Sequence, residues 1–207
     1  MGDDMKKICL FFILFLIPFI VYGEEVNLAD GAKSAIMIET STGKVIYEKN
    51  VDEQLPMASM TKMMSLYLIM EAINQGHLNY TDEVVISEHA ASMGGSQIWL
   101  KPYEIMSVDA LLRAVAIASA NDAVVALAEK IAVSEENFVT LMNQQAQEWG
   151  LENTHFMNTS GLHHEEHYST AKDMAIIAIH LIQEGHLKQC LSAHSSAQPV
   201  QHTPQWT

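Results

Sequence analysis

Cysteine is scarce in this chain of 207 residues, which contains only Cys9 and Cys190. Cys9 lies inside an apolar run near the N-terminus and would leave with that run if it were cleaved. Cys190 would then have no partner within the chain, so the mature protein would contain no internal disulfide. A domain of this kind must be stabilised by its core, which suits an exported bacterial protein better than a secreted eukaryotic domain.

Basic residues are also few. The chain has 11 Lys and Arg against 25 Asp and Glu, which gives a net charge of −14 at pH 7. Proteins that bind nucleic acids present a basic patch, so this balance argues against a nucleic-acid partner. Hydrophobic residues make up 49% of the chain and charged residues 17%, so the sequence predicts one folded domain with a substantial core.

The apolar run from Ile8 to Val21 is shorter than the ~20 residues that a membrane-spanning helix needs. It follows Lys6 and Lys7, and small or tolerated residues come after it. This order predicts a signal peptide over residues 1–23, cleaved after Gly23, and therefore export. The alternative is an uncleaved segment that would attach the protein to the membrane.

Asp, Glu, Lys and Arg are absent from the C-terminal segment, Gln189 to Thr207. The segment shows neither apolar periodicity nor a strand pattern. One interpretation is a disordered tail, which is common at chain termini. Disordered segments are usually charged, however, so the composition also fits a stretch translated out of frame.

The pattern of apolar and turn residues predicts an α+β domain in which a hairpin is followed mostly by helices. The segments 34–39 and 44–48 are rich in apolar residues and flank a four-residue turn that ends at Gly43. The helix predicted over 59–74 is apolar nearly all round and should lie buried in the centre of the domain. Further helices, with serine or threonine caps at several of their starts, are predicted over 107–119, 122–132, 134–149 and 169–184.

Ser59 and Lys62 stand at the start of the predicted central helix, in the sequence S-M-T-K. Residues three apart share a helix face, so the lysine amine can reach the serine hydroxyl. A serine is a weak nucleophile until a neighbouring base accepts its proton. The pair therefore predicts a nucleophile and its base, although the four-residue pattern alone also occurs by chance.

Ser119-Ala120-Asn121 interrupts an alanine-rich helical stretch. Polar side chains in so apolar a setting need hydrogen-bond partners. One alternative is that Ser119 or Asn121 simply caps the next helix, and cap preferences alone favour it. Taken together with Ser59 and Lys62, the triplet is better interpreted as a second element of an active site.

Several stretches, in order, carry a resemblance to a known family: E-T-S-T-G-K-V-I-Y-E-K-N, P-M-A-S-M-T-K-M-M, M-G-G-S, A-I-A-S-A-N-D-A-V-V-A-L-A-E, N-T-H-F-M-N-T-S-G-L and H-Y-S-T-A-K-D-M-A. From about Ala35 to Glu184 the chain resembles the D-alanyl-D-alanine carboxypeptidases, the low-molecular-mass penicillin-binding proteins of the S11 serine peptidases. The resemblance implies the transpeptidase fold of penicillin-binding proteins and β-lactamases, with a helical subdomain. It also implies a role in peptidoglycan biosynthesis at the cell wall, in the bacterial envelope.

The resemblance implies a role for each residue of the two motifs. Ser59 would attack the stem peptide of peptidoglycan, and Lys62 would take its proton. Ser119 would relay protons to the departing amine, and Asn121 would bind the substrate backbone and help to hold Lys62. The Ser59 N–H would form half of an oxyanion hole. No metal or cofactor is implied, and β-lactam antibiotics should acylate Ser59.

The third motif of the family, K-T-G, does not occur in this chain. In the family its lysine recognises the substrate carboxylate, and its strand supplies the second oxyanion donor. The later sheet strands and the C-terminal domain with its membrane anchor are not found either. We therefore expect a partial catalytic domain over residues 24–188, followed by an atypical tail over 189–207 from a truncated or shifted reading frame. A catalytically impaired fragment is accordingly an alternative to an active enzyme.

The segment His163-His164-Glu165-Glu166-His167 suggests two other functions. A metal site is disfavoured, because the spacing is not H-E-x-x-H and the segment is predicted to be a loop. Class A β-lactamases carry a deacylating glutamate in the corresponding loop, so Glu165 or Glu166 could support a serine β-lactamase. The residues around them follow the carboxypeptidase pattern instead.

Overall fold

The computed structural model describes residues 28–183 of the chain. The chain divides into two compact units, Met1–Gly31 and Ala32–Thr207, and every described helix and strand belongs to the second. The predicted signal peptide (1–23) and the uncharged tail (189–207) lie outside the described residues. Within the described part, no helix combines the length and the apolar character needed to cross a bilayer.

The predicted hairpin forms from β1 (Ala35–Glu39) and β2 (Lys44–Lys49). The two strands pair antiparallel, with Ala35 opposite Lys49 and an irregularity in register between Met37 and Ile38. Gly43 ends the turn with a φ of +71°, a conformation that glycine adopts without steric cost.

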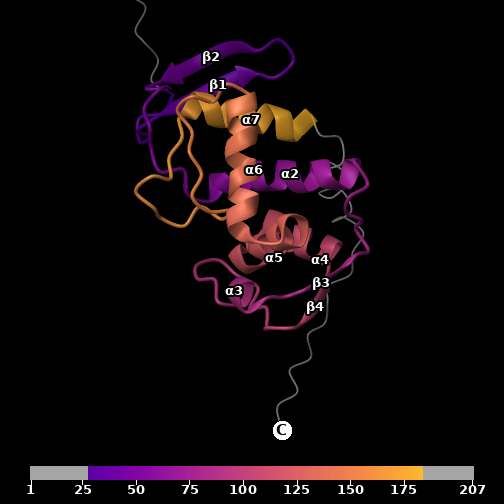
Figure 1. Ribbon diagram of the computed structural model, residues 1–207. Coiled ribbons are helices and arrows are strands. Elements are labelled where there is room, and N and C mark those ends of the chain that lie inside the picture. Colours follow the sequence, from indigo (N-terminus) through magenta and orange to yellow (C-terminus); the bar gives the residue numbers. More distant parts are fainter. Residues whose placement is uncertain (1–27, 184–207) are drawn as a thin grey trace, which may run out of the picture. The chain divides into compact units, whose positions relative to one another are not determined.

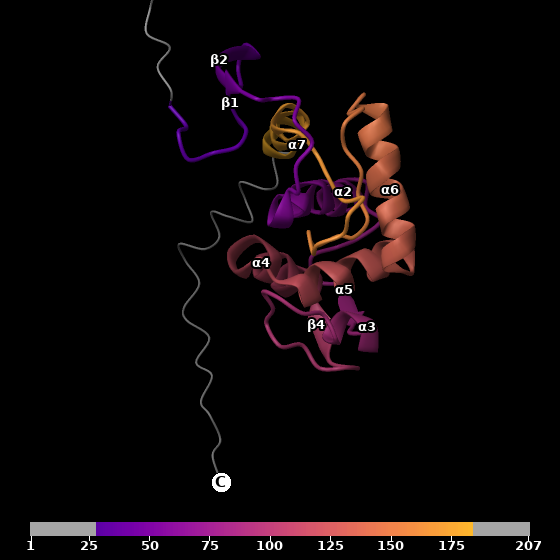
Figure 2. The ribbon, with the colours of Figure 1, turned by 90° about the vertical axis from the view of Figure 1, so that its left-hand side faces the viewer.

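A buried helix occupies the centre of the second unit. The chain enters it through the 3-10 turn η1 (Ala58–Thr61) and continues as α2 (Lys62–Asn74). Met64, Ile69 and Met70 of α2 are fully buried, as the all-round apolar pattern predicted. In Figures 1 and 2, α2 lies between α7 on one side and α5 on the other, and it contacts both.

The other long helices are α4 (Val108–Ala118), α5 (Asn121–Ala132), α6 (Glu135–Glu148) and α7 (Ala171–Gln183). Helices α5, α6 and α7 pack against α2, and α4 packs against α5. Three predicted caps are present. The side chains of Ser107, Ser134 and Thr170 each accept a backbone N–H from the first turn of α4, α6 and α7 respectively. Helix α7 also packs against β1, which places the hairpin over it (Figure 1).

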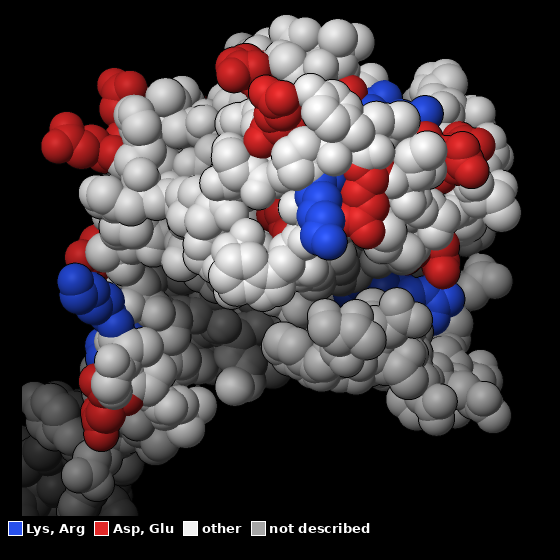
Figure 3. All heavy atoms as spheres, turned by 90° about the horizontal axis from the view of Figure 1, so that it is seen from below, with Lys and Arg blue, Asp and Glu red and all other residues white. Residues whose placement is uncertain are grey.

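A second two-stranded sheet was not predicted. Strand β3 (Glu83–Val85) pairs antiparallel with β4 (Ile105–Ser107), and the short helix α3 (Glu88–Ala91) lies in the connection between them. The expectation of one hairpin followed by helices was therefore incomplete, because strands of three residues are too short to show an alternating pattern. Viewed from below, on the face in Figure 3, the described acidic side chains lie scattered, and the few described Lys and Arg side chains do not merge into one basic patch.

Candidate active site

Ser59 lies in η1, directly before the buried helix α2, and is exposed to solvent. Lys62 is the first residue of α2, and its Nζ lies 3.5 Å from the Ser59 Oγ. This separation exceeds the ~2.9 Å of an optimal N–H···O bond, and catalytic hydrogen bonds commonly tighten only in the transition state. The structure thus brings Ser59 and Lys62 together, as their spacing predicted.

Lys62 is almost completely buried, with 4% of its surface exposed. Its Nζ donates a hydrogen bond of 2.7 Å to the carbonyl oxygen of Ser160. Burial lowers the pKa of Lys62 from 10.5 to about 8, because the charged ammonium loses its hydration. A lysine with this pKa is partly in its neutral amine form near pH 7, and the neutral amine can accept a proton from a hydroxyl.

The loop between α6 and α7, residues 149–170, packs directly against the nucleophile turn, which is the 3-10 turn η1 that carries Ser59. At Gly161, where φ is +90°, a Cβ atom would lie 1.9 Å from the Ala58 carbonyl oxygen and 2.9 Å from the Ser59 nitrogen. Nearby, the Ser65 hydroxyl donates to the Thr159 carbonyl at 2.7 Å. Only glycine allows the backbones to approach this closely, so the loop fixes the surroundings of Ser59.

Ser119 and Asn121 lie between α4 and α5. Ser119 ends α4 in the left-handed conformation, with φ at +55°. Asn121 is the first residue of α5, but the residue that caps this helix is Ala120, and no side chain satisfies the cap. Neither Ser119 nor Asn121 is therefore the N-cap of α5, and that alternative is wrong, although Ser119 is the C-cap of α4.

Asn121 anchors a neighbouring loop instead. Its Nδ2 donates to the Gly94 carbonyl at 2.7 Å, and its backbone N–H donates to the Ser96 carbonyl at 2.7 Å. Within residues 28–183, no hydrogen bond joins Lys62 to Ser119 or to Asn121. The roles expected for Ser119 and Asn121 toward Lys62 remain predictions.

Close contacts at Gly95 and Gly161 nevertheless link the surroundings of Asn121 to those of Ser59. A Cβ at Gly95 would lie 2.8 Å from the Asn121 Nδ2 and 3.7 Å from the Leu162 side chain. Leu162 follows Gly161, which touches the nucleophile turn. The loop of residues 149–170 therefore connects the surroundings of Ser59 to those of Asn121.

Glu135 is a supporting residue that the sequence did not single out. Its Oε1 accepts hydrogen bonds from the Thr159 N–H and hydroxyl at 3.0 and 2.8 Å, and its Oε2 lies 2.8 Å from the His89 Nε2. It thereby ties the loop to the start of α6 and to α3. The available signal was an acidic side chain in the first turn of a helix, which ordinarily indicates only a favourable interaction with the helix dipole.

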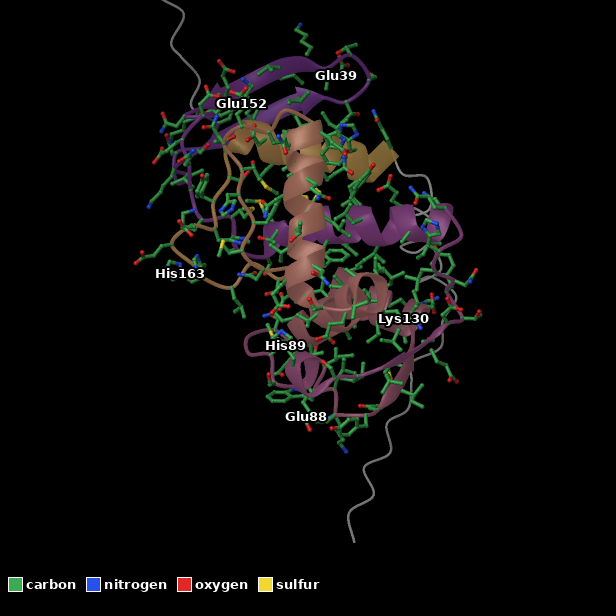
Figure 4. All side chains as sticks on the ribbon, in the orientation of Figure 1. Glu39, Glu88, His89, Lys130, Glu152 and His163 are labelled. Atoms are coloured by element: carbon green, nitrogen blue, oxygen red, sulfur yellow. The ribbon has the colours of Figure 1, made fainter. Side chains whose placement is uncertain are left out.

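The histidine and glutamate segment separates into two environments. Residues 163 to 166 are exposed, whereas His167 is buried. Figure 4 shows His163 at the outer edge of the loop. Among residues 28–183, no group of three or more His, Cys, Asp or Glu side chains is arranged to hold a metal ion. Glu165 and Glu166 are exposed, and among residues 28–183 neither carboxylate forms a hydrogen bond with the buried amine of Lys62.

Comparison with known proteins agrees with the family resemblance found in the sequence. The sequence profile of D-alanyl-D-alanine carboxypeptidases matches residues 24–206. The chain is 57% identical to the D-alanyl-D-alanine carboxypeptidase DacF of Bacillus subtilis over 157 residues, which cover 76% of this chain and 40% of DacF.

Two solved structures extend the likeness to the fold. The D-alanyl-D-alanine carboxypeptidase DacD from Francisella tularensis aligns with a TM-score of 0.73 at 36% identity, covering 83% of this chain and 40% of DacD. Penicillin binding protein 5 from Haemophilus influenzae aligns with a TM-score of 0.72 at 38% identity, covering 74% and 45% of the two chains. The expected transpeptidase-type fold is confirmed, and the chain spans about 40% of the length of the curated relatives it matches.

Proposed function

Because the chain belongs to the D-alanyl-D-alanine carboxypeptidase family, we propose that Ser59 removes the terminal D-alanine from peptidoglycan stem peptides through an acyl-enzyme. One observation carries this proposal: the exposed Ser59 hydroxyl lies 3.5 Å from the buried Lys62 amine. Burial lowers the pKa of that amine to about 8. An accessible hydroxyl beside a base of this strength is suited to nucleophilic attack on a carbonyl.

Acylation begins when the neutral Lys62 amine accepts the Ser59 proton. The Ser59 Oγ attacks the carbonyl carbon of the penultimate D-alanine, and the negative charge gathers on the carbonyl oxygen. The Ser59 N–H can stabilise this oxyanion, because no hydrogen bond within residues 28–183 occupies it. As the peptide bond breaks, the proton passes from Lys62 through Ser119 to the departing amine, so that D-alanine leaves as a neutral amine and the ester on Ser59 remains.

In deacylation, water is the nucleophile and the Ser59 oxygen is the leaving group. The Lys62 amine accepts a proton from a water molecule that attacks the ester carbonyl. The Ser59 oxygen leaves and recovers a proton from Lys62, which restores the starting state. Asn121 is proposed to support both steps by holding the substrate backbone, and the hydrogen bond from its Nδ2 to the Gly94 carbonyl would keep the amide in a fixed orientation.

β-Lactam antibiotics are proposed as covalent inhibitors at the same residue, because opening of the strained lactam amide forms the same type of Ser59 ester. The Haemophilus influenzae protein of similar fold is a penicillin binding protein, which supports this proposal. Peptidoglycan as the substrate places the protein in the bacterial envelope, reached by export or by attachment through an uncleaved signal segment.

Labelling with a fluorescent penicillin tests the proposal. The wild-type chain should become covalently labelled and should release D-alanine from a short peptide ending in D-alanyl-D-alanine. Ser59→Ala should do neither, while Ser92→Ala, at an exposed serine that ends α3, should react like wild type. A wild-type chain that stays unlabelled would contradict the proposal and favour the impaired fragment, whereas rapid nitrocefin turnover would favour a β-lactamase.

A further inference from the structure

The residue before the nucleophile adopts an unusual backbone conformation. Ala58 has a φ of +47°, in the left-handed region that residues with a side chain rarely adopt. The Ala58 carbonyl oxygen accepts a hydrogen bond of 2.7 Å from the Thr61 hydroxyl, and Gly161 also packs closely against it. The direction of the Ala58–Ser59 peptide is thus fixed by contacts beyond Ser59 itself.

Thr61, inside the S-M-T-K motif, is completely buried and connects to a second buried side chain. Its Oγ1 lies 2.7 Å from the Nε2 of His167, which has 3% of its surface exposed. Because the single hydroxyl proton of Thr61 goes to the Ala58 carbonyl, the Thr61 oxygen must act as the acceptor toward His167.

The other ring nitrogen of His167 fixes the tautomer. Its Nδ1 lies 2.9 Å from the Met157 backbone nitrogen, which can only donate. Nδ1 is therefore unprotonated, and the proton of the neutral ring sits on Nε2. Burial, with smaller contributions from His155 and His164, lowers the pKa of His167 to about 4, which keeps the ring neutral. All donors then point one way, from Met157 through His167 and Thr61 to the Ala58 carbonyl.

We propose that His167 and Thr61 are positioning residues for the nucleophile, acting through the Ala58 carbonyl. They hold the peptide that carries the Ser59 N–H, and thus set the directions of the hydroxyl and the oxyanion donor together. This inference rests on the proposed acyl transfer at Ser59. The relay is the row of hydrogen bonds from Met157 through His167 and Thr61 to the Ala58 carbonyl. Breaking it should slow the acylation of Ser59 and leave the initial binding of the β-lactam nearly unchanged.

A matched pair of variants at Thr61 tests this. Thr61→Val keeps the shape and removes the hydroxyl, whereas Thr61→Ser keeps the hydroxyl and removes a methyl group. The acylation rate of the full chain is followed over a range of fluorescent penicillin concentrations. We expect Thr61→Val to lower the rate at saturation by about tenfold or more, with the half-saturating concentration nearly unchanged. Thr61→Ser should stay close to wild type, and equal losses in the two variants would overturn the proposal.

His167 supplies an independent variant. His167→Phe keeps an aromatic ring and removes both nitrogens, and it should slow acylation as Thr61→Val does. Because the two residues act in one chain, the double variant should be no slower than the slower single variant. Losses that multiply would show that the residues act separately and would contradict the relay.

Nuclear magnetic resonance tests the relay without any penicillin reaction. The His167 ring should show the Nε2-protonated tautomer, and the Ser59 amide signal should shift in Thr61→Val but not in Thr61→Ser. An Nδ1-protonated ring, or a Ser59 signal that does not respond, would overturn the inference. If the relay is present but the wild-type chain is never acylated, the proposed function fails and the positioning of Ser59 stands.

Discussion

Lys62 and Ser160, separated by 98 positions in the chain, are joined by a hydrogen bond of 2.7 Å from the lysine Nζ to the serine carbonyl oxygen. A carbonyl oxygen orients the amine without supplying a full negative charge. Had a carboxylate stood there, it would have favoured the charged ammonium and raised the pKa of Lys62. The backbone partner therefore holds the amine in place while burial keeps its pKa low.

Replacing Lys62 removes the proposed base. We expect Lys62→Ala to slow acylation of Ser59 by fluorescent penicillin by about 10²–10⁴-fold, the usual contribution of a positioned general base. Lys172→Ala is the matched control, because Lys172 is an exposed lysine in a long ion pair with Asp52. Acylation of Lys62→Ala at the wild-type rate would contradict the proposed mechanism.

The pH dependence of acylation should follow the titration of Lys62. Only the neutral amine accepts a proton, so the rate should rise with pH, pass its midpoint near the pKa of about 8, and level off above it. The measurement is the rate of penicillin labelling between pH 5 and pH 10 in buffers of constant ionic strength. The residual rate of Lys62→Ala should lack this rise, and a rise that persisted in the variant would assign it to another group.

Gly161 is expected to tolerate no side chain. A Cβ there would meet backbone atoms of Ala58 and Ser59, so Gly161→Ala must displace the nucleophile turn. Gly76→Ala is the control, since Gly76 has a φ of +73° but no atom within 4 Å of its Cβ position. We expect Gly76→Ala to lower the free energy of unfolding by about 1 kcal/mol, and Gly161→Ala to lower it further and abolish labelling. Urea unfolding and labelling together would show whether the two variants differ as expected.

Asp122 supports the loop that Asn121 contacts. Its buried carboxylate accepts the backbone N–H groups of Ile98 and Leu100, and also that of Ala123. Asp122→Asn keeps the shape but replaces one acceptor oxygen with a donor, and should lower the free energy of unfolding by about 1–3 kcal/mol.

Hydrogen exchange provides the site-specific check on Asp122. The amides of Ile98 and Leu100 should exchange faster in Asp122→Asn than in wild type. Asp109→Asn, which removes a surface charge in the first turn of α4 and weakens its pair with Arg113, should change stability by less than about 1 kcal/mol. Unchanged exchange at both amides would show that the carboxylate does not anchor the loop.

His89 should make stability depend on pH. Its hydrogen bond to Glu135 raises its pKa above 6.5 in the folded protein, with Glu129 and Glu136 contributing smaller charge effects. A histidine whose pKa is raised by folding stabilises the fold fully when the pH is below the pKa of the unfolded state. This stabilisation is lost as the pH rises through the pKa of the folded state. The side chain is half exposed, so the effect should stay below about 1 kcal/mol. His89→Gln should remove this part of the pH dependence in urea unfolding measured from pH 5 to pH 9.

Local patterns predicted the parts of the fold that depend on neighbours in sequence. Ser107 and Ser134 cap their helices as expected, and the hairpin turns at Gly43, because caps and turns are decided within a few residues. The nucleophile pair was found for the same reason, since its geometry is one helical turn. The sheet of β3 and β4 was missed because each strand has three residues and gains its partner only from the fold.

Contacts across the chain could not be derived from local patterns. The N-T-S-G-L stretch showed a resemblance to a family but not which groups it would touch. Ser160 binds Lys62 and Gly161 abuts Ala58 only after the loop folds back over η1. His167 was weighed only as a disfavoured metal ligand and as the first residue of the H-Y-S-T-A-K-D-M-A stretch. Its contact with Thr61 was missed because burial separates it from its exposed neighbours, and burial is a tertiary property.

The position of Ser160 also sets a limit for protein engineering. A designer who copied the Ser59–Lys62 turn onto the end of an unrelated helix would transplant the nucleophile and the amine, but not the carbonyl or the surface that covers the lysine. That lysine would stay hydrated, with a pKa near the ordinary value of about 10.4, and at neutral pH it would hold its proton. A transferable acyl-transfer module therefore has to include the second segment of chain, which the four-letter motif does not encode.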